Sequence, residues 1–190
     1  MNRSAFLKTC LSGVCGCGFL GLQGSALRLD GGQAGQDATT PPDLETLKWQ
    51  VEGGRVRFAK LIAILGEHVD AATRSKILNS LGRECAHDYD AVFAKYKGDL
   101  DGFLAKIKSG WAERAEYDKE KGVLRIFCKP APCACPLVKA GLTPEVFCDC
   151  TLGWQEAAYS AVTGKRTFAE IEESVLRGGS RCVFRITFLG

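Results

Sequence analysis

Five cysteines gather between residues 128 and 150, and four of them form two Cys-x-Cys pairs. In an extended backbone, residues two apart point to the same side, so each pair can aim two sulfurs at one point. Thiolates are preferred sulfur ligands of zinc, and four of them complete its tetrahedral shell. The spacing therefore predicts a zinc site. Its candidate ligands are the four paired cysteines, Cys133, Cys135, Cys148 and Cys150, with Cys128 and Cys182 as two further candidates.

The same segment holds four of the six prolines of the chain. Proline suits neither a helix interior nor an inner strand, so something other than backbone hydrogen bonding must order this segment. Besides a metal, disulfides between the two pairs are one alternative, because exported proteins meet an oxidising compartment. A reactive thiol is another, because Cys150 comes just before a helix expected to begin at Thr151, where the helix dipole favours a thiolate. The sequence leaves these three interpretations open.

A second place for thiol chemistry is Cys85, which has a base, His87, two residues further on. Residues two apart on a helix point in different directions, so the two side chains can meet only if the helix ends between them. Spacing from Leu78 and Leu81 also suits Cys85 to core packing. A catalytic pair of Cys85 and His87 is therefore kept as the alternative. The sequence has no phosphate-binding loop and no dinucleotide-binding glycine fingerprint.

The composition bounds the class of protein. A chain of 190 residues with 46% hydrophobic content is long enough for one domain with a substantial core. Its net charge is +3, and lysines and arginines alternate with acidic residues. A basic run suited to nucleic acid is missing, so we expect a small-molecule ligand and no nucleic-acid partner.

Residues 1–29 are expected to be an export signal or anchor. Arg3 and Lys8 precede a modestly apolar, glycine-rich run, and Ser4 stands where a twin-arginine signal has its second arginine. Residues 30–42 are expected to be a linker, since they are rich in Gly, Gln, Thr and Pro. We therefore expect an exported protein, periplasmic or membrane-associated, that meets a membrane only through its N-terminal segment. A cytoplasmic location is the alternative.

Residues 43–190 are expected to form a single cysteine-rich α+β domain. Asp43, Asp70 and Asp99 each precede an apolar pattern of helical period and are expected to cap helices. Gly53-Gly54 is expected to weaken or break the first helix. After residue 110 the period changes. The remaining elements are a hairpin at 111–128 whose second strand is buried on both sides, a helix from Thr151 to about Val162, and a second hairpin at 167–188. This order predicts N-terminal helices packed on an antiparallel sheet with one inserted helix.

Two stretches resemble known bacterial proteins. The run Leu81-Gly82-Arg83-Glu84-Cys85-Ala86, followed by the Cys-x-Cys pairs and Gly153-Trp154, resembles L-2-amino-thiazoline-4-carboxylic acid hydrolase-like proteins. The closing run from Glu173 to Phe184 is similar to the end of vinyl-4-reductase-type ligand-binding domains. The resemblance implies an α+β fold with a small-molecule pocket beside a cysteine-rich zinc site. It matches Cys150 and Cys182 to cysteines of that site and places Ser174 where another cysteine stands.

The sequence thus predicts a small-molecule-binding domain with a thiolate metal site, most suited to zinc. The alternative is a metal- or thiol-dependent hydrolase that opens a small cyclic amide-like or thiazoline substrate.

Overall fold

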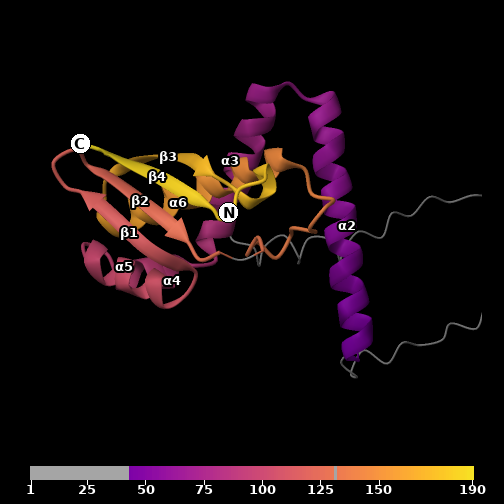
Figure 1. Ribbon diagram of the computed structural model, residues 1–190, viewed down its shortest axis with the longest axis horizontal. Coiled ribbons are helices and arrows are strands. Elements are labelled where there is room, and N and C mark those ends of the chain that lie inside the picture. Colours follow the sequence, from indigo (N-terminus) through magenta and orange to yellow (C-terminus); the bar gives the residue numbers. More distant parts are fainter. Residues whose placement is uncertain (1–42, 131) are drawn as a thin grey trace, which may run out of the picture. The chain divides into compact units, whose positions relative to one another are not determined.

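The computed structural model describes residues 43–130 and 132–190 (Figure 1). The segments predicted as export signal and linker, residues 1–29 and 30–42, lie outside the described residues. A four-stranded antiparallel sheet has the strand order β1-β2-β4-β3. Its strands are β1 (Ala112–Asp118), β2 (Val123–Cys128), β3 (Arg166–Glu173) and β4 (Val183–Leu189).

Five α-helices accompany the sheet in the described part of the chain. They are α2 (Leu44–His68), α3 (Ala71–His87), α4 (Asp90–Lys95), α5 (Leu100–Ser109) and α6 (Asp149–Thr163). Four precede the sheet, and α6 lies between the two hairpins along the chain, so the predicted α+β order is confirmed. None of these helices is both long and apolar enough to cross a membrane.

Three aspartates begin helices as predicted. The carboxylates of Asp43, Asp70 and Asp99 accept hydrogen bonds from the backbone N–H groups of Thr46, Thr73 and Gly102 at 2.8–3.0 Å. Each bond satisfies one of the donors that the first helical turn leaves free. Gly164, in the left-handed conformation with φ 72°, ends α6.

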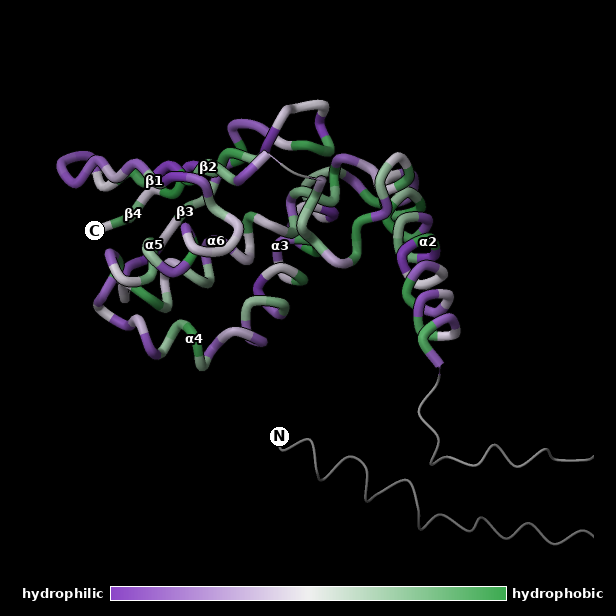
Figure 2. The backbone as a smooth tube through the Cα atoms, turned by 60° about the horizontal axis from the view of Figure 1, so that its bottom comes forward, coloured by the Kyte–Doolittle hydropathy of each residue, from purple (hydrophilic) through white to green (hydrophobic). Residues whose placement is uncertain are grey.

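The expected break at Gly53-Gly54 is wrong, because α2 continues through both glycines. Two glycines cost a helix about 2 kcal/mol relative to alanine, and contacts on both sides of them outweigh that cost. Arg55 Nε donates to the Pro136 carbonyl at 2.7 Å, and Lys139 forms an ion pair with Glu52. The middle of α2 is thereby tied to the cysteine-rich segment. Hydrophilic and hydrophobic residues alternate along the whole of α2 (Figure 2).

Helix α6 packs between α3 and the inner face of the sheet. Its residues Ala158, Tyr159 and Val162 are fully buried in one apolar cluster with Leu124, Ile126 and Ile186 of the sheet. The expectation that β2 is buried on both sides is only partly right, because Phe127 on the outer face is buried whereas Arg125 on the same face is not. Arg125, which alternates with those inward residues, is exposed and pairs with Glu172 of β3 at 2.5 Å. The outer face of the sheet carries charged pairs instead of a second layer.

Candidate functional site

All seven described cysteines are free thiols, and they come from six parts of the fold. Cys85 lies on α3, Cys128 ends β2, and Cys182 immediately precedes β4. Cys133 and Cys135 lie in the segment between β2 and the 3-10 helix η1 (Glu145–Cys148), Cys148 ends η1, and Cys150 lies in the first turn of α6. Four of the thiols, Cys128, Cys148, Cys150 and Cys182, therefore lie where β2 and η1 end and where α6 and β4 begin.

Four of these thiols form what we call the strand-end thiol group: Cys128, Cys133, Cys148 and Cys182. Cys128 and Cys182 extend the β2–β4 pairing by one position, since the Cys128 N–H donates to the Cys182 carbonyl at 2.9 Å. Their thiols also shift each other's pKa values, in opposite directions. Cys133 and Cys148 lie near Cys182, since the charge of Cys182 raises the pKa values of both.

Ser174 joins this group through its hydroxyl. The Ser174 Oγ lies 3.0 Å from the Cys148 Sγ, and both side chains are buried. The same hydroxyl interacts with the Cys182 thiol. Ser174 therefore stands between two cysteines of the group, at the position where the resemblance suggested a missing sulfur.

Hydrogen bonding and burial set the protonation of the strand-end thiol group. The hydrogen bond from Cys128 lowers the pKa of Cys182 to about 6, and it raises the pKa of Cys128 itself. Burial raises the pKa of Cys148, although the Ser174 hydroxyl and Arg177 oppose that effect. The two thiols therefore titrate as a pair, in which Cys182 favours the thiolate and Cys128 favours the proton.

The remaining three thiols form what we call the helix-crossing thiol group: Cys85, Cys135 and Cys150. Cys150 is buried in a second apolar cluster, against which Cys135 packs. Burial, followed by the charges of Cys85 and Cys135, raises the pKa of Cys150 to about 12. Each Cys-x-Cys pair thus contributes one sulfur to each group, although Cys135 also acts on Cys133 and Cys148 on Cys150. A single centre at Cys133, Cys135, Cys148 and Cys150 stays a prediction.

The donor chemistry of the strand-end thiol group fits zinc. It offers four sulfurs and the Ser174 hydroxyl, and zinc takes four such ligands. Arg177 and Arg181 act on Cys148 and Cys128 in the direction that favours thiolates. Within the described ranges, no three candidate ligands are already arranged to hold an ion. A metal would therefore have to draw these thiols closer together.

The alternative catalytic residues Cys85 and His87 have different surroundings. His87 Nδ1 lies 3.2 Å from a carboxylate oxygen of Asp90, and both side chains are exposed. Burial raises the pKa of Cys85, and the charges of Cys135, Asp88 and Glu84 raise it further. Cys85 is therefore a neutral thiol at pH 7, unlike the activated thiolate that nucleophilic catalysis requires.

Alkylation of the metal-free protein should distinguish Cys182 from the other thiols. In chelator-treated protein, we expect Cys182 to react with iodoacetamide at pH 7 and to titrate near pH 6. Alanine at Cys128 removes the hydrogen bond that stabilises the thiolate, so the pKa of Cys182 rises and its rate at pH 7 falls by about tenfold. Mass spectrometry of the peptide containing Cys182 measures the rate, with Cys85→Ala as the control. A Cys182 rate that begins to rise only above about pH 8 would contradict this assignment.

Two polar atoms of α6 side chains are buried without a partner. The side chains of Gln155 and Tyr159 are 2% and 0% exposed, and the Gln155 Oε1 and the Tyr159 hydroxyl have no hydrogen-bond partner among the described residues. They are four residues apart, on the α6 face that packs on the sheet. Sequence reasoning missed this pair; a glutamine and a tyrosine at helical spacing on an otherwise apolar face was the available signal.

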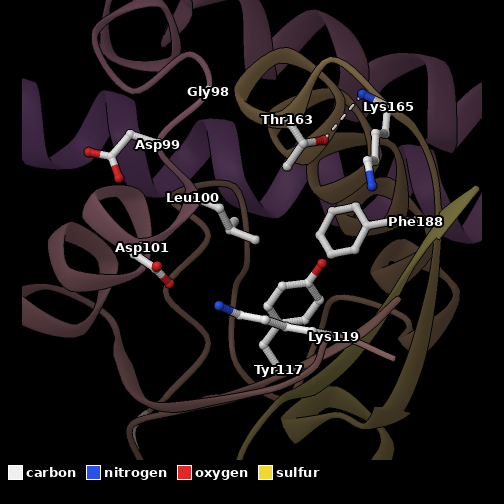
Figure 3. A pocket seen from close by; sticks show the side chains of 9 residues that line it. All are labelled: Gly98, Asp99, Leu100, Asp101, Tyr117, Lys119, Thr163, Lys165 and Phe188. Atoms are coloured by element: carbon white, nitrogen blue, oxygen red, sulfur yellow. Dashed lines mark hydrogen bonds between the residues drawn. The ribbon is translucent and has the colours of Figure 1, made fainter. Parts of the chain in front are cut away.

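Two surface pockets lie elsewhere. One, of about 290 Å³, is lined by charged side chains around Tyr117 and Phe188, including Asp99, Lys119 and Lys165 (Figure 3). It sits at the ends of α6 and β4 that are opposite to the thiols. The other, of about 320 Å³, contains the buried carboxylate of Glu156, which pairs with Arg83. Both pockets include charged side chains in their lining, whereas the ligand expected from the sequence needs an apolar site.

Comparison with known proteins finds similarity to solved structures but none to a protein family or a curated protein. No protein family matches the sequence, and no curated protein does. Nothing therefore supports the resemblance to thiazoline hydrolase-like proteins. Among solved structures, a trafficking protein particle complex subunit 3 from Naegleria fowleri, covalently bound to palmitic acid, is similar with a TM-score of 0.54 and 16% identity. The match covers 75% of this chain and 97% of that one.

A second solved structure is similar at a lower level. It is the phenol-responsive sensory domain of the transcription activator PoxR with phenol, at a TM-score of 0.47 and 12% identity, covering 70% of this chain and 74% of that one. At these identities the likeness concerns the fold, and the argument about function depends on the side chains of this chain.

Proposed function

We propose that the domain binds a small organic molecule between α6 and the sheet, and that it holds zinc at the strand-end thiol group. The observation that carries the first half is the pair of buried, unpartnered polar atoms on Gln155 and Tyr159. An unsatisfied buried polar group costs about 1–3 kcal/mol, so native proteins rarely retain two without a reason. A bound molecule that pairs with both atoms supplies that reason.

The chemistry of the two atoms defines the ligand class. The Gln155 Oε1 is an acceptor and needs a donor, whereas the Tyr159 hydroxyl can donate to an acceptor. The Tyr159 ring packs edge-on against Phe103 and Phe188, with centroids 5.6 and 6.4 Å away. A small planar molecule with one hydroxyl or amide group on an apolar ring suits these surroundings. The palmitic acid of the trafficking subunit indicates that a protein of this fold can carry a hydrophobic molecule.

Zinc is proposed for the strand-end thiol group because of its ligand types. Cys128, Cys148 and Cys182 would be ligands, and Cys133 would complete the tetrahedron. The Ser174 hydroxyl would hydrogen-bond the Cys148 sulfur. Bound zinc would cross-link β2, β4 and η1 through its bonds to the thiolates. It would thereby hold the end of the α6–sheet interface next to Gln155.

Replacing Tyr159 by Phe tests ligand binding with a change of one oxygen. Without ligand, we expect Tyr159→Phe to be neutral or to stabilise the fold by up to about 2 kcal/mol, because an unpaired hydroxyl leaves the interior. Phenol is expected to raise the unfolding midpoint of the wild type more than toluene, which has the same shape but no hydroxyl. The variant should lose this preference. Calorimetric unfolding with each compound measures both effects.

Thr163→Val is the matched control. It removes a hydroxyl from the last residue of the same helix, where Thr163 donates to the Tyr159 carbonyl. It should keep the preference for phenol. Equal stabilisation by phenol in the wild type and in Tyr159→Phe would contradict the proposed ligand site. A Tyr159→Phe variant destabilised by about 2 kcal/mol without ligand would show that the hydroxyl already has a partner.

A further inference from the structure

The pocket of about 320 Å³ that contains Glu156, which we call the edge-strand pocket, lies at one edge of the sheet. Strand β3 is the last in the order β1-β2-β4-β3, so it pairs with β4 on one side and with no strand on the other. An edge strand leaves every second backbone N–H without a strand partner. Side chains of α3 and α6 close this edge into a pocket.

Glu156 and Arg83 form the charged pair of the edge-strand pocket. The Glu156 side chain is only 10% exposed, and one of its carboxylate oxygens pairs with Arg83. The other oxygen accepts a hydrogen bond from the Ala169 N–H at 3.3 Å. Arg83 Nε also donates to the side chain of Asn79 at 3.0 Å. The guanidinium of Arg83 is thus held from two sides, and three of its five N–H groups have no partner among the described residues.

Arg166 and the backbone of Thr167 bring further donors to the same pocket. Arg166 is exposed, and no salt bridge holds it within the described part of the chain. The Ala169 N–H points away from β4, toward Glu156. Because N–H groups alternate in direction along a strand, the N–H of Thr167, two residues earlier, faces the same free edge. The pocket therefore offers two guanidinium groups and one backbone N–H to a ligand.

The hydroxyl groups of the pocket use their protons within the protein. The Thr167 hydroxyl donates to the Glu156 carbonyl at 2.7 Å. Its contact with the Ser160 hydroxyl at 2.8 Å therefore requires Ser160 to donate. Neither hydroxyl has a proton left for a ligand, so the arginines and the Thr167 N–H are the donors on which ligand binding depends.

We propose that the edge-strand pocket binds a small monocarboxylate that carries an apolar group. Its two arginines and one glutamate leave one positive charge, which a single carboxylate balances, and a guanidinium fork matches the geometry of a carboxylate. Phe168 and Leu189 also line the pocket and remain 51% and 39% exposed, which suits an apolar group on the ligand. This site shares no residue with the zinc and ligand sites proposed above.

Cyclohexanecarboxylate is the probe that tests this proposal on the full-length chain. It carries one carboxylate on a ring that is neither planar nor hydroxylated, unlike the ligand proposed for the α6–sheet interface. Titration into ¹⁵N-labelled protein should shift the amide resonance of Thr167, and cyclohexylmethanol, its neutral counterpart, should not. Arg166→Gln and Arg83→Lys should each weaken binding by at least about fivefold. Arg166 is exposed, and lysine keeps the positive charge beside Glu156, so both variants should fold.

Arg57→Gln is the matched control, because it removes an exposed arginine of α2 and should leave the affinity unchanged. Unchanged affinity in both Arg166→Gln and Arg83→Lys would overturn the proposal, as would equal binding of cyclohexylmethanol or a Thr167 amide that does not shift. Shifts at Gln155 and Tyr159 in place of Thr167 would also overturn it, since the carboxylate would then occupy the α6–sheet interface. The preference of that interface for phenol is measured separately, so either proposal can fail alone.

Discussion

Alanine at Gly82 or at Gly153 is expected to destabilise the protein by about 3 kcal/mol or more, or to prevent folding. In each case the new methyl group would overlap a backbone carbonyl of the facing helix, and backbone cannot rotate away as a side chain can. The helices would have to separate, although the contact between α3 and α6 is the most extensive between any two described elements. Urea unfolding followed by circular dichroism measures the change.

Gly54→Ala is the matched control for this prediction. Gly54 lies inside α2, and a Cβ atom there would have no atom within 4 Å. Alanine is the better helix former by about 1 kcal/mol, so this variant should be more stable than the wild type. If Gly82→Ala and Gly54→Ala changed stability by the same amount and in the same direction, the close crossing of α3 and α6 would be contradicted.

The second large effect is expected in zinc affinity. Alanine at Cys148 or Cys182 removes a proposed ligand and should weaken zinc binding by about 100-fold or more. Alanine at Cys150 or Cys85 should change it by less than about threefold, because those thiols belong to the helix-crossing thiol group. Competition with a chromophoric zinc chelator gives the affinities.

Cys148 and Cys150 form an informative pair of variants, since they are two residues apart and both buried. A site built on the Cys-x-Cys pairs would lose affinity equally in both variants. Equal losses would therefore support the single centre expected from the spacing. A large loss in the Cys148 variant and a small one in the Cys150 variant would support two separate groups.

Much of the fold could be predicted from local signals. The caps Asp43, Asp70 and Asp99 were recognisable because a capping carboxylate acts within its own first turn. The strands from 112 to 128 were recognisable from their alternation and polar turn. The continuity of α2 through Gly53-Gly54 was not, since the ties that hold it come from Pro136 and Lys139, about eighty residues away.

The proposed division of the thiols differs from the single centre that spacing alone predicts. Residues two apart point the same way in an extended backbone, but Cys148 ends η1 and Cys150 lies in the first turn of α6. In a helix, two residues differ by about 200° in direction, so the two sulfurs diverge. Cys182, in contrast, lies beside Cys128 because β2 pairs with β4. The sequence placed these two strands in separate hairpins. Whether the polar atoms of Gln155 and Tyr159 have hydrogen-bond partners depends on residues that pack around them from other elements, so no local sequence pattern could predict it.

X-ray absorption at the zinc edge of the reduced, full-length protein tests the central claim most directly. The account predicts about one zinc per chain, surrounded by three or four sulfurs at ~2.3 Å. In Cys148→Ala we expect one sulfur fewer or no bound zinc, and in Cys150→Ala we expect the unchanged spectrum. A zinc shell of nitrogen and oxygen alone, or less than about half a zinc per chain after reducing purification, would contradict the thiolate site.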